Sequence, residues 1–232
     1  SLTYSLISGL KDDDKALFRI VNNELQSDAA FNFETKNEFS IRVRSTDNDN
    51  AFVDKNFIIF ATDKNDLPTS LDINKKSFFE SDNIGTAIGS LLATDPDQDD
   101  TQKFSLVTGD NDTDNAKFLV SGDELLLNTQ PDFETKSFYN IRLAITDGQG
   151  GTLEKAFILE VKDTNDPPSK IEINDNIITE NLPVSSTVGK LVTTDPDATE
   201  EFVYTLLPDF DATKFYIVND FLKSNVVFDF ES

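Results

Sequence analysis

The stretch DKNDLP at residues 63–68 returns one hundred residues later as DTNDPP at residues 163–168, and this pair of acidic, proline-containing segments decides how the chain is organised. Three further motifs keep the same period: NFETK at 32–36 with DFETK at 132–136, TD at 46–47 with 146–147, and TDPD at 94–97 with 194–197. An internal repeat of this length indicates tandem domains joined by linkers. Apart from apolar positions, the side chains that recur most faithfully carry oxygen. We therefore predict a metal ion, calcium, held between domains.

The period divides the sequence into three repeats, of which the middle one is complete. We predict a partial repeat at residues 1–66, a complete repeat at 67–166 and a partial repeat at 167–232. Tyr4 aligns with Phe104 and Tyr204, so the first repeat enters at its third strand and lacks the two before it. The third repeat stops short of its last two strands. Missing strands leave unpaired backbone and half a hydrophobic interior, so we expect the native protein or a neighbouring molecule to supply them.

The middle repeat has the pattern of seven short strands separated by turns. We expect strands at 71–79, 86–93, 103–107, 117–120, 124–128 and 138–146, and a last one in which Phe157, Leu159 and Val161 face one way. Within 138–146, four apolar residues (Tyr139, Ile141, Leu143, Ile145) alternate with four that we expect to face water (Asn140, Arg142, Ala144, Thr146). No segment has a helical period. This pattern predicts an all-β fold of tandem seven-stranded Greek-key β-sandwiches of the immunoglobulin-like type.

Composition excludes several classes of function. The chain has 20 basic and 43 acidic side chains, a formal net charge of −23, which disfavours nucleic acid and anionic membrane surfaces as partners. A hydrophobic content of 38% with 20 Phe supports packed cores and argues against disorder. No apolar run approaches the roughly 20 residues of a membrane-spanning helix. The sequence contains neither Cys nor His, so thiol chemistry and the commonest general base are both excluded.

Five kinds of motif together resemble those of cadherin repeats. VGKLVTTDPD at 188–197 is similar to the family's second strand and Asp-x-Asp motif, and PDFE at 131–134 to its Asp-x-Glu motif. ITD at 145–147 is similar to Ala-x-Asp, and DTNDP at 163–167 to the linker. The motifs stand in family order, several recur at the fixed period, and the resemblance covers essentially the whole chain. It is closest to the bacterial cadherin-like type, and it implies a cadherin-type fold with calcium at each junction between repeats.

The resemblance also implies which residues bind the ion. At the first junction the expected ligands are Glu34, Asp63, Asn65, Asp66, Asp95, Asp97, Asp99 and Asp147. At the second junction they are Glu80, Asp132, Glu134, Asp163, Asn165, Asp166, Asp195 and Asp197. The first set departs from the family pattern, because Asn32 replaces an aspartate and the amino-terminal glutamate is missing. Motif residues whose partners lie outside the chain are expected to be half-sites with weak or no binding: Asp47, Glu180, Asp229 and Glu231.

An all-oxygen ligand set favours calcium over other metals. Calcium accepts six to eight oxygens in irregular geometry, whereas magnesium prefers a strict octahedron with retained waters. The lack of His and Cys argues against zinc, copper and iron. Without an ion, packed carboxylates repel one another by about 1–4 kcal/mol per close pair in high-dielectric surroundings. We therefore expect the rigidity of the linkers to depend on the bound ion.

Not every acidic run fits a metal site. We expect the runs at residues 12–14 and 110–112 to lie on solvated loops. The segment from Asp95 to Asp99 opens like an EF-hand, but its sixth and twelfth positions are Asp100 and Leu106, where that motif needs Gly and Glu. Phe18, Phe118 and Phe215 share one place in the three repeats, and we expect them in hydrophobic cores.

The sequence thus favours a calcium-stiffened tandem module of a large extracellular or cell-surface protein, acting as a spacer and adhesion element. Its first partners would be the other cadherin-like repeats of the same chain. The alternative is a calcium-dependent module that binds a surface polysaccharide or another copy of itself. An enzyme is not expected, because the abundant carboxylates are accounted for as ligands and no nucleophile–base constellation is visible.

Overall fold

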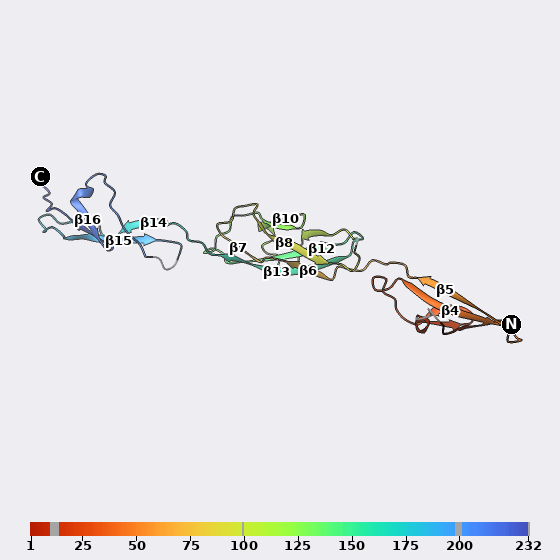
Figure 1. The fold of residues 1–232 in the computed structure, drawn as a ribbon. Coiled ribbons are helices and arrows are strands. Elements are labelled where there is room, and N and C mark those ends of the chain that lie inside the picture. Colours follow the sequence, from red (N-terminus) through yellow and green to blue (C-terminus); the bar gives the residue numbers. More distant parts are fainter. Residues whose placement is uncertain (10–13, 99, 198–200, 232) are drawn as a thin grey trace. The chain divides into compact units, whose positions relative to one another are not determined.

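The computed structural model describes residues 1–9, 14–98, 100–197 and 201–231, and these residues form mainly β-strands (Figure 1). The first repeat (1–66) contains β1 (Thr3–Leu6), β2 (Phe18–Val21), β3 (Glu24–Ser27), β4 (Glu38–Thr46) and β5 (Phe52–Phe60). The middle repeat (67–166) contains β6 (Ser70–Ile73), β7 (Ser77–Phe79), β8 (Ala87–Thr94), β9 (Lys103–Leu106), β10 (Phe118–Ser121), β11 (Glu124–Leu127), β12 (Phe138–Thr146) and β13 (Thr152–Lys162). The third repeat (167–232) contains β14 (Lys170–Ile173), β15 (Thr187–Thr194), β16 (Phe215–Val218) and β17 (Phe221–Ser224).

Three single-turn 3-10 helices interrupt the strands: η1 (Lys15–Leu17), η2 (Asn115–Lys117) and η3 (Ala212–Lys214). No helix among the described residues is long and apolar enough to cross a membrane. The predicted all-β fold is therefore confirmed, with sandwiches of the immunoglobulin-like type.

Packing divides the chain into two compact units. The first consists of Ser1–Lys75, Ala87–Leu126 and Asn140–Phe157, and the second of Lys76–Thr86, Leu127–Tyr139 and Ile158–Ser232. The names first, middle and third repeat therefore remain divisions of the sequence. The strand orders of the sheets are β1-β4-β5, β2-β3, β10-β11-β8-β6, β7-β13-β12-β9 and β14-β15-β17-β16.

In the first unit, the long strands β4 and β5 pair antiparallel from Glu38↔Phe60 to Thr46↔Phe52. The β2–β3 hairpin turns through Asn22 and Asn23, whose φ angles of 51° and 67° suit the tight turn that matches strand twist. Phe18, Phe39 and Ile41 form a buried cluster beneath these strands. Asparagine tolerates the left-handed conformation better than most residues. The two asparagines therefore determine the turn, whereas burial in the core determines which face of each strand points inward.

Alternation in β12 places its apolar residues in the core, as predicted. Tyr139, Ile141, Leu143 and Ile145 are buried, as are Phe157, Leu159 and Val161 of β13. The expectation that Ala144 faces water is wrong, because only 4% of this residue is exposed. It lies opposite Ser105 of β9, and a methyl group projects so little from a sheet that longer neighbours cover it.

The strand expected at 71–79 is two strands that belong to different sheets. β6 pairs with β8, whereas β7 pairs in parallel with β13 through Glu160↔Ser77. The break falls at Asn74, whose side-chain oxygen accepts a hydrogen bond from the N–H of Ser90 at 2.9 Å while its own N–H donates to the carbonyl of Ser90 at 3.1 Å. Both groups are thereby satisfied where the chain leaves one sheet for the other. Period-two alternation cannot reveal this switch, because both halves carry the pattern.

The third repeat lacks the strand expected around Tyr204. Residues 201–207 form no strand, although their counterparts in the other repeats are β1 and β9. β1 pairs with β4 and β9 pairs with β12, and no described residue of the third repeat supplies a counterpart of β4 or β12. A strand needs a hydrogen-bonding neighbour, so a suitable sequence alone leaves this segment irregular.

Asp14 does not lie on a solvated loop as expected, and Asp12 and Asp13 of the same run lie outside the described residues. Asp110 and Asn111 do lie on an exposed turn, and Asp112 beside them is half-buried. Only 7% of Asp14 is exposed, and its oxygens accept hydrogen bonds from the ammonium of Lys36 at 2.5 Å and the N–H of Ser40 at 2.8 Å. Asp114 repeats the second bond with the N–H of Asn140 at 2.7 Å. Burial raises the pKa of Asp14, but these donors outweigh it and hold the pKa below its ordinary value. Each aspartate thus ties a 3-10 turn to a core strand.

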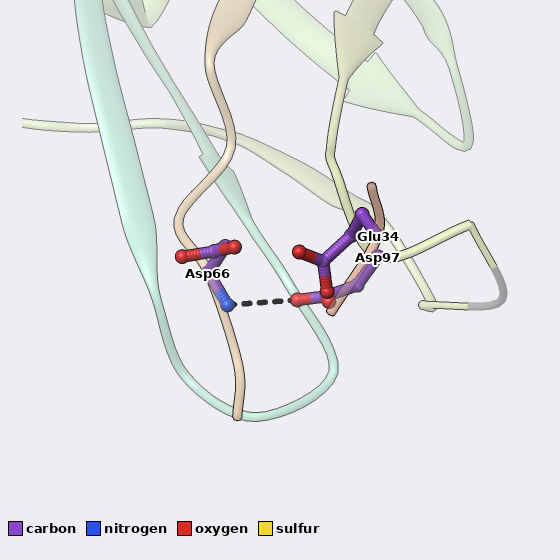
Figure 2. A group of neighbouring side chains, drawn as sticks. All are labelled: Glu34, Asp66 and Asp97. Carbon is purple, nitrogen blue, oxygen red and sulfur yellow. Dashed lines mark hydrogen bonds between the residues drawn. The ribbon is translucent and has the colours of Figure 1, made fainter. Parts of the chain in front are cut away.

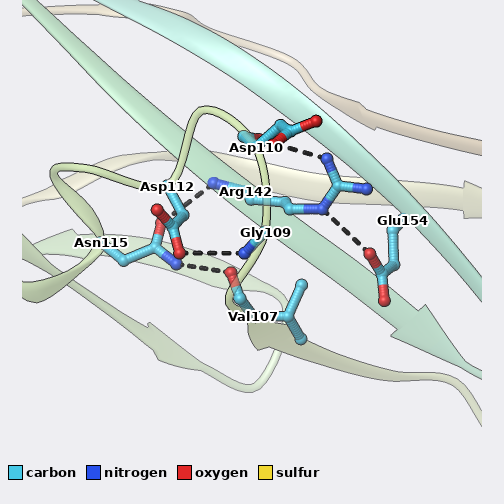
Figure 3. Close-up of polar contacts among 7 residues, drawn as sticks. All are labelled: Val107, Gly109, Asp110, Asp112, Asn115, Arg142 and Glu154. Atoms are coloured by element: carbon cyan, nitrogen blue, oxygen red, sulfur yellow. Dashed lines mark hydrogen bonds and ion pairs between the residues drawn. The ribbon is translucent and has the colours of Figure 1, made fainter.

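Polar contacts around Arg142 fix the loop between β9 and η2 (Figure 3). The guanidinium of Arg142 donates to Glu154 of β13 at 2.9 Å and to the carbonyl of Asp110 at 3.2 Å. Its backbone N–H donates to the side-chain oxygen of Asn115 at 2.9 Å, and the Asn115 amide donates to the carbonyl of Val107 at 2.8 Å. The loop is therefore held by backbone groups as well as by charge.

Phenylalanines at the shared core position are buried in two repeats. Phe18 is 8% and Phe118 2% exposed, which confirms the prediction for these two. Phe215 is half-buried and stacks on Phe228 with ring centroids 5.4 Å apart. The shared position is therefore buried in the first and middle repeats and only half-buried in the third.

Phe57 and Phe157 provide a matched test of a difference in burial, because they occupy the same place in β5 and β13 but are 40% and 5% exposed. Phe157→Ala should lower the free energy of unfolding by about 3–5 kcal/mol, the usual loss for a buried aromatic. Phe57→Ala should cost clearly less, since part of the ring already contacts water. Urea unfolding of both variants measures the difference, and equal losses would contradict it.

Candidate metal centre

Three carboxylates converge in the first unit, and we call Glu34, Asp66 and Asp97 the first acidic cluster (Figure 2). Glu34 lies in the loop between β3 and β4, Asp66 in the linker between β5 and β6, and Asp97 directly after β8. Each offers an oxygen that lies within 4.8 Å of the others. Three of the expected ligands, one before the linker, one in it and one after it, therefore lie close together.

Backbone N–H groups hold one oxygen of the central carboxylates and leave the other without a partner. The N–H of Asp66 donates to Oδ2 of Asp97 at 2.8 Å (Figure 2), and the N–H of Asp97 donates to Oδ1 of Asp95 at 3.0 Å. The second oxygens, Oδ1 of Asp97 and Oδ2 of Asp95, are buried and have no hydrogen-bond partner within the described ranges. Such an arrangement orients the remaining oxygen for a ligand.

Asp147 and Asn65 continue this pattern. Oδ1 of Asp147 accepts the N–H groups of Gln149 and Gly151 at 2.9 and 2.7 Å, and its Oδ2 accepts the Asn65 amide at 3.0 Å. The Asn65 bond, together with the backbone N–H groups, outweighs burial and holds the pKa of Asp147 below its ordinary value. Oδ1 of Asn65 is buried and without a partner among the residues described.

Electrostatic repulsion is already visible at Glu34. A hydrogen bond to its own backbone N–H lowers the pKa of the exposed Glu34, but some loss of hydration and the charges of Asp66, Asp63 and Asp97 outweigh it and raise the pKa. Asp63 also lines a cavity of about 430 Å³ together with Glu34 and Asp97. Seven of the eight ligands expected at the first junction are thus brought together, and Asp99 lies outside the described residues.

The second unit has two such groups that share Glu134, and we call their union the second acidic cluster. It comprises Glu80 with Asp132 and Glu134, and Glu134 with Asp163 and Asp197. Glu80 follows β7, Asp163 follows β13 and Asp197 comes after β15, while Asp132 and Glu134 lie between β11 and β12. In each group the ligand oxygens lie within 4.8 Å of one another.

Glu80 is the most firmly held member. It is 6% exposed, its Oε2 accepts the N–H of Phe133 at 2.8 Å, and its Oε1 accepts the N–H and hydroxyl of Thr164 at 2.6 and 3.2 Å. Burial raises the pKa of Glu80, yet these donors outweigh it and hold the pKa below the ordinary value. Glu80 therefore stays charged and ties the segment after β7 to the second linker.

The second linker repeats the hydrogen bonds of the first at an interval of one hundred residues. The N–H of Asp166 donates to Oδ2 of Asp197 at 2.7 Å, and the N–H of Asp197 donates to Oδ1 of Asp195 at 3.0 Å. The Asn165 amide donates to the carbonyl of Asp166 at 2.8 Å, as Asn65 does to Asp66. Oδ2 of Asp195 is buried and unpartnered in the described part of the chain.

Loss of hydration and, after it, repulsion between like charges raise three pKa values in the second acidic cluster. Partial burial, followed by the charges of Asp197 and Glu80, raises the pKa of Asp163. The pKa of Asp166 rises for the same reasons, chiefly burial and Glu80. A bond to its own backbone N–H lowers the pKa of Glu134, but burial and the charge of Glu80 outweigh this and raise it. All eight expected residues of the second junction are therefore near one another or bonded within the linker.

These donor sets fit a hard divalent cation. They consist of carboxylate and amide oxygens, which calcium and magnesium prefer. A buried oxygen without a hydrogen bond costs free energy unless something compensates for it, and five such oxygens belong to Asn65, Asp95, Asp97, Asp100 and Asp195. Asp100 was not among the predicted ligands, because it lies beyond the Asp-x-Asp motif. The sequence feature that points to Asp100 is its position in the acidic run of residues 97–100.

Two sets of expected half-sites also have a regular geometry. Glu180, Asp229 and Glu231 come within the same 4.8 Å limit, and the N–H of Phe230 donates to Oε2 of Glu180 at 3.0 Å, as Phe133 does to Glu80. Asp47 accepts the N–H groups of Asp49 and Ala51 at 2.9 Å each, as Asp147 does in its own loop. Their geometry follows the repeat, and weak or missing binding there stays a prediction.

Sequence comparisons point to cadherin relatives. The chain is 26% identical over 238 residues to the Fat-like cadherin-related tumor suppressor homolog of Drosophila melanogaster, a match that covers 97% of this chain and 5% of that protein. It is 28% identical over 204 residues to human Protocadherin Fat 4, covering 84% and 4%. The chain therefore spans about a twentieth of the length of these relatives. No family model matches it.

Solved structures share its fold. Part of mouse Cadherin-23 (EC22-24) matches with a TM-score of 0.71 and 19% identity, over all of this chain and 77% of that one. Extracellular cadherin domains 1-5 of Protocadherin Gamma B2 match with a TM-score of 0.64 and 17% identity, covering 99% and 47%. The likeness to these two solved structures shows the cadherin-type fold. The sequence relatives, which are named as a cadherin-related protein and a protocadherin, support the resemblance to cadherin repeats.

Glu80 and Glu180 allow a matched test of the anchoring that holds these sites. In metal-free buffer, Glu80→Ala should lower the free energy of unfolding by about 1–3 kcal/mol, because the N–H groups of Phe133 and Thr164 lose their acceptor. Glu180→Ala should cost less, since Glu180 is less buried and water can replace it as the acceptor for the N–H of Phe230. Denaturant unfolding gives both values. Equal stability of Glu80→Ala and the wild type would show that the anchoring bonds contribute nothing.

Proposed function

We propose that this chain is a calcium-stiffened tandem cadherin-like module of a larger extracellular or cell-surface protein, serving as a spacer and adhesion element. The observation that carries the proposal is the pair of acidic clusters at the linkers, in which carboxylates are anchored by backbone N–H groups. In the described part of the chain, four buried oxygens beside the first cluster and one beside the second have no hydrogen-bond partner. No feature of this kind is needed for a solvated acidic surface, because water satisfies exposed carboxylates.

The proposed ligands are those expected from the sequence, with Asp99 included on that ground alone. At the first linker, Glu34 comes from one repeat, Asp66 from the linker and Asp97 from the next repeat. Their charges repel one another and favour separation of the segments that bear them. Bound Ca²⁺ would supply positive charge and oxygen coordination at this point. Hydrogen bonds already hold the anchored carboxylates in one orientation. Binding an ion would therefore cost little side-chain conformational entropy.

The whole protein's adhesion role is part of the proposal, because the matched relatives are about twenty times longer than this chain. Absence of enzymatic activity belongs here too: the carboxylates are assigned as ligands, and the sequence has no His or Cys. The finer assignment to the bacterial cadherin-like type rests on the sequence motifs alone, since the relatives named above are animal proteins.

Binding to a second copy is the alternative that a specific observation favours. Outward-facing side chains of β5 are unusually apolar, with Phe52, Ile58 and Phe60 exposed by 59, 57 and 65%. Exposed apolar groups that gather on one strand are typical of interaction surfaces. A similar solved structure, Protocadherin gammaB7 EC3-6, is described as a cis-dimer (TM-score 0.63, 20% identity). A surface polysaccharide stays a weaker candidate, because no described feature favours it.

Self-association through β5 should respond to charge on this strand. We expect the wild-type chain to show a concentration-dependent mass by analytical ultracentrifugation and Phe60→Lys to remove that dependence, because a buried ammonium opposes association. Ile158→Lys in β13, at a side chain 63% exposed, is the matched control and should leave association unchanged. A monomer at all concentrations would remove the homophilic alternative.

Calcium binding itself is tested by thermal unfolding in excess calcium, in excess magnesium and in chelator. A ligand present at one hundred times its dissociation constant stabilises the folded state by about 2.7 kcal/mol, so calcium should raise the unfolding temperature clearly. Magnesium should do so less, because its small octahedral shell suits these crowded oxygens poorly. Asp97→Asn and Asp197→Asn should each reduce the calcium effect, as each removes a shared carboxylate.

Small-angle scattering then tests the spacer role. Calcium should narrow the distribution of interdomain distances relative to chelator, since the linkers lose freedom when their carboxylates are coordinated. Superimposable profiles in the two buffers would contradict the stiffening, even where calcium raises the unfolding temperature.

A further inference from the structure

We infer that Asp100 is an additional cation ligand of the first acidic cluster, and this inference rests on the proposed calcium binding there. Asp100 ends the acidic loop that follows β8, five residues after Asp95. The cadherin-like motifs do not assign it a role. Its own geometry assigns one.

The Asp100 carboxylate has the same half-anchored arrangement as those of Asp95 and Asp97. One oxygen, Oδ1, accepts the N–H of Thr101 at 3.2 Å. The other, Oδ2, is buried and has no hydrogen-bond partner among the residues described. The loop backbone is itself held, because the N–H of Asp100 donates to the carbonyl of Asp97 at 3.2 Å. Three carboxylates of one short loop therefore each carry a buried oxygen that the described protein groups leave unsatisfied.

Asp100 also lines the cavity that contains the predicted ligands. Glu34, Asp63, Asp97 and Asp100 all border the same space of about 430 Å³. The loop that holds Asp147 approaches from the other direction, where a Cβ on Gly148 would lie 2.5 Å from Oδ1 of Asp100. A larger residue at position 148 would therefore require the side chains of Asp100 and Thr101 to shift. The loops that carry Asp97 and Asp147 are thus packed together beside Asp100.

A role in capping the backbone explains the position of Oδ1 of Asp100, but it does not explain the buried Oδ2. As a cap for Thr101, the side chain would need one oxygen, and an asparagine would serve nearly as well. Burying the second oxygen unpaired costs free energy, and a cation at the cavity would remove that cost. Asp100 also restores a carboxylate to a cluster in which Asn32 stands where the second cluster has Asp132. Its counterpart in the next repeat, Glu200, lies outside the described residues.

The test is a calcium titration of the full chain followed by the NMR amide signals of Gly148 and Thr164. Gly148 reports on the first cluster, and Thr164, which donates to Glu80, reports on the second. Asp100→Asn should raise the calcium concentration at the Gly148 midpoint about tenfold or more, in the range found when groups around a metal are removed. The Thr164 midpoint should stay unchanged. Asp110→Asn removes the same charge from an exposed turn (Figure 3) and should change neither midpoint by more than about twofold.

Asp100→Glu separates direct coordination from charge at a distance. It keeps the charge but moves the carboxylate by one methylene, so a direct ligand should still bind calcium more weakly than in the wild type. Amide spectra in chelator show whether each variant is folded. If both Asp100 variants titrate like Asp110→Asn while Gly148 and Thr164 still respond to calcium, Asp100 is no ligand and the proposed function stands. If neither amide responds to calcium in the wild type, both the proposed function and the role of Asp100 are wrong.

Discussion

Like charges held within a few ångströms of one another are the constraint on which this structure depends. Glu34, Asp66 and Asp97 meet at the first linker, and the second linker gathers a larger set around Glu134. Raised pKa values at Glu34, Glu134, Asp163 and Asp166 follow from this crowding together with partial burial. The concentration of these carboxylates at both linkers is the basis of the proposed cation binding.

Backbone hydrogen bonds make the crowding tolerable. The N–H groups of Asp66 and Asp166 hold one oxygen of Asp97 and Asp197, and those of Phe133 and Thr164 hold Glu80. Each bond favours the charged form of its carboxylate and fixes its direction. The same N–H groups lie in segments that have no strand partner in the described ranges. Linker backbone and carboxylate side chains therefore satisfy each other's hydrogen-bonding groups.

Much of the fold could be predicted because its signals are local. Alternation in β12 and β13 identified the buried residues, with Ala144 as the exception, and the spacing of turns indicated a sandwich of short strands. The division of one expected strand into β6 and β7 could not be predicted, since the switch depends on which sheet offers a free edge. The irregular segment around Tyr204 has the same cause: it has the sequence of a strand but no described neighbour to pair with. Strand pairing depends on two segments, and the local sequence of one segment does not show which other segment is available to pair with it.

The candidate site divides in the same way. The hundred-residue period by itself determined that oxygen-bearing residues recur at two linkers, because each repeat must present the same groups to the next. Only the tertiary structure decided that Asp14 is a buried structural carboxylate and that Asp100 has a buried oxygen, unpartnered among the described residues, beside the first acidic cluster. Composition treats all acidic residues alike. Whether an aspartate faces water, a backbone N–H or a cavity depends on loops that are brought together by strands far apart in the chain.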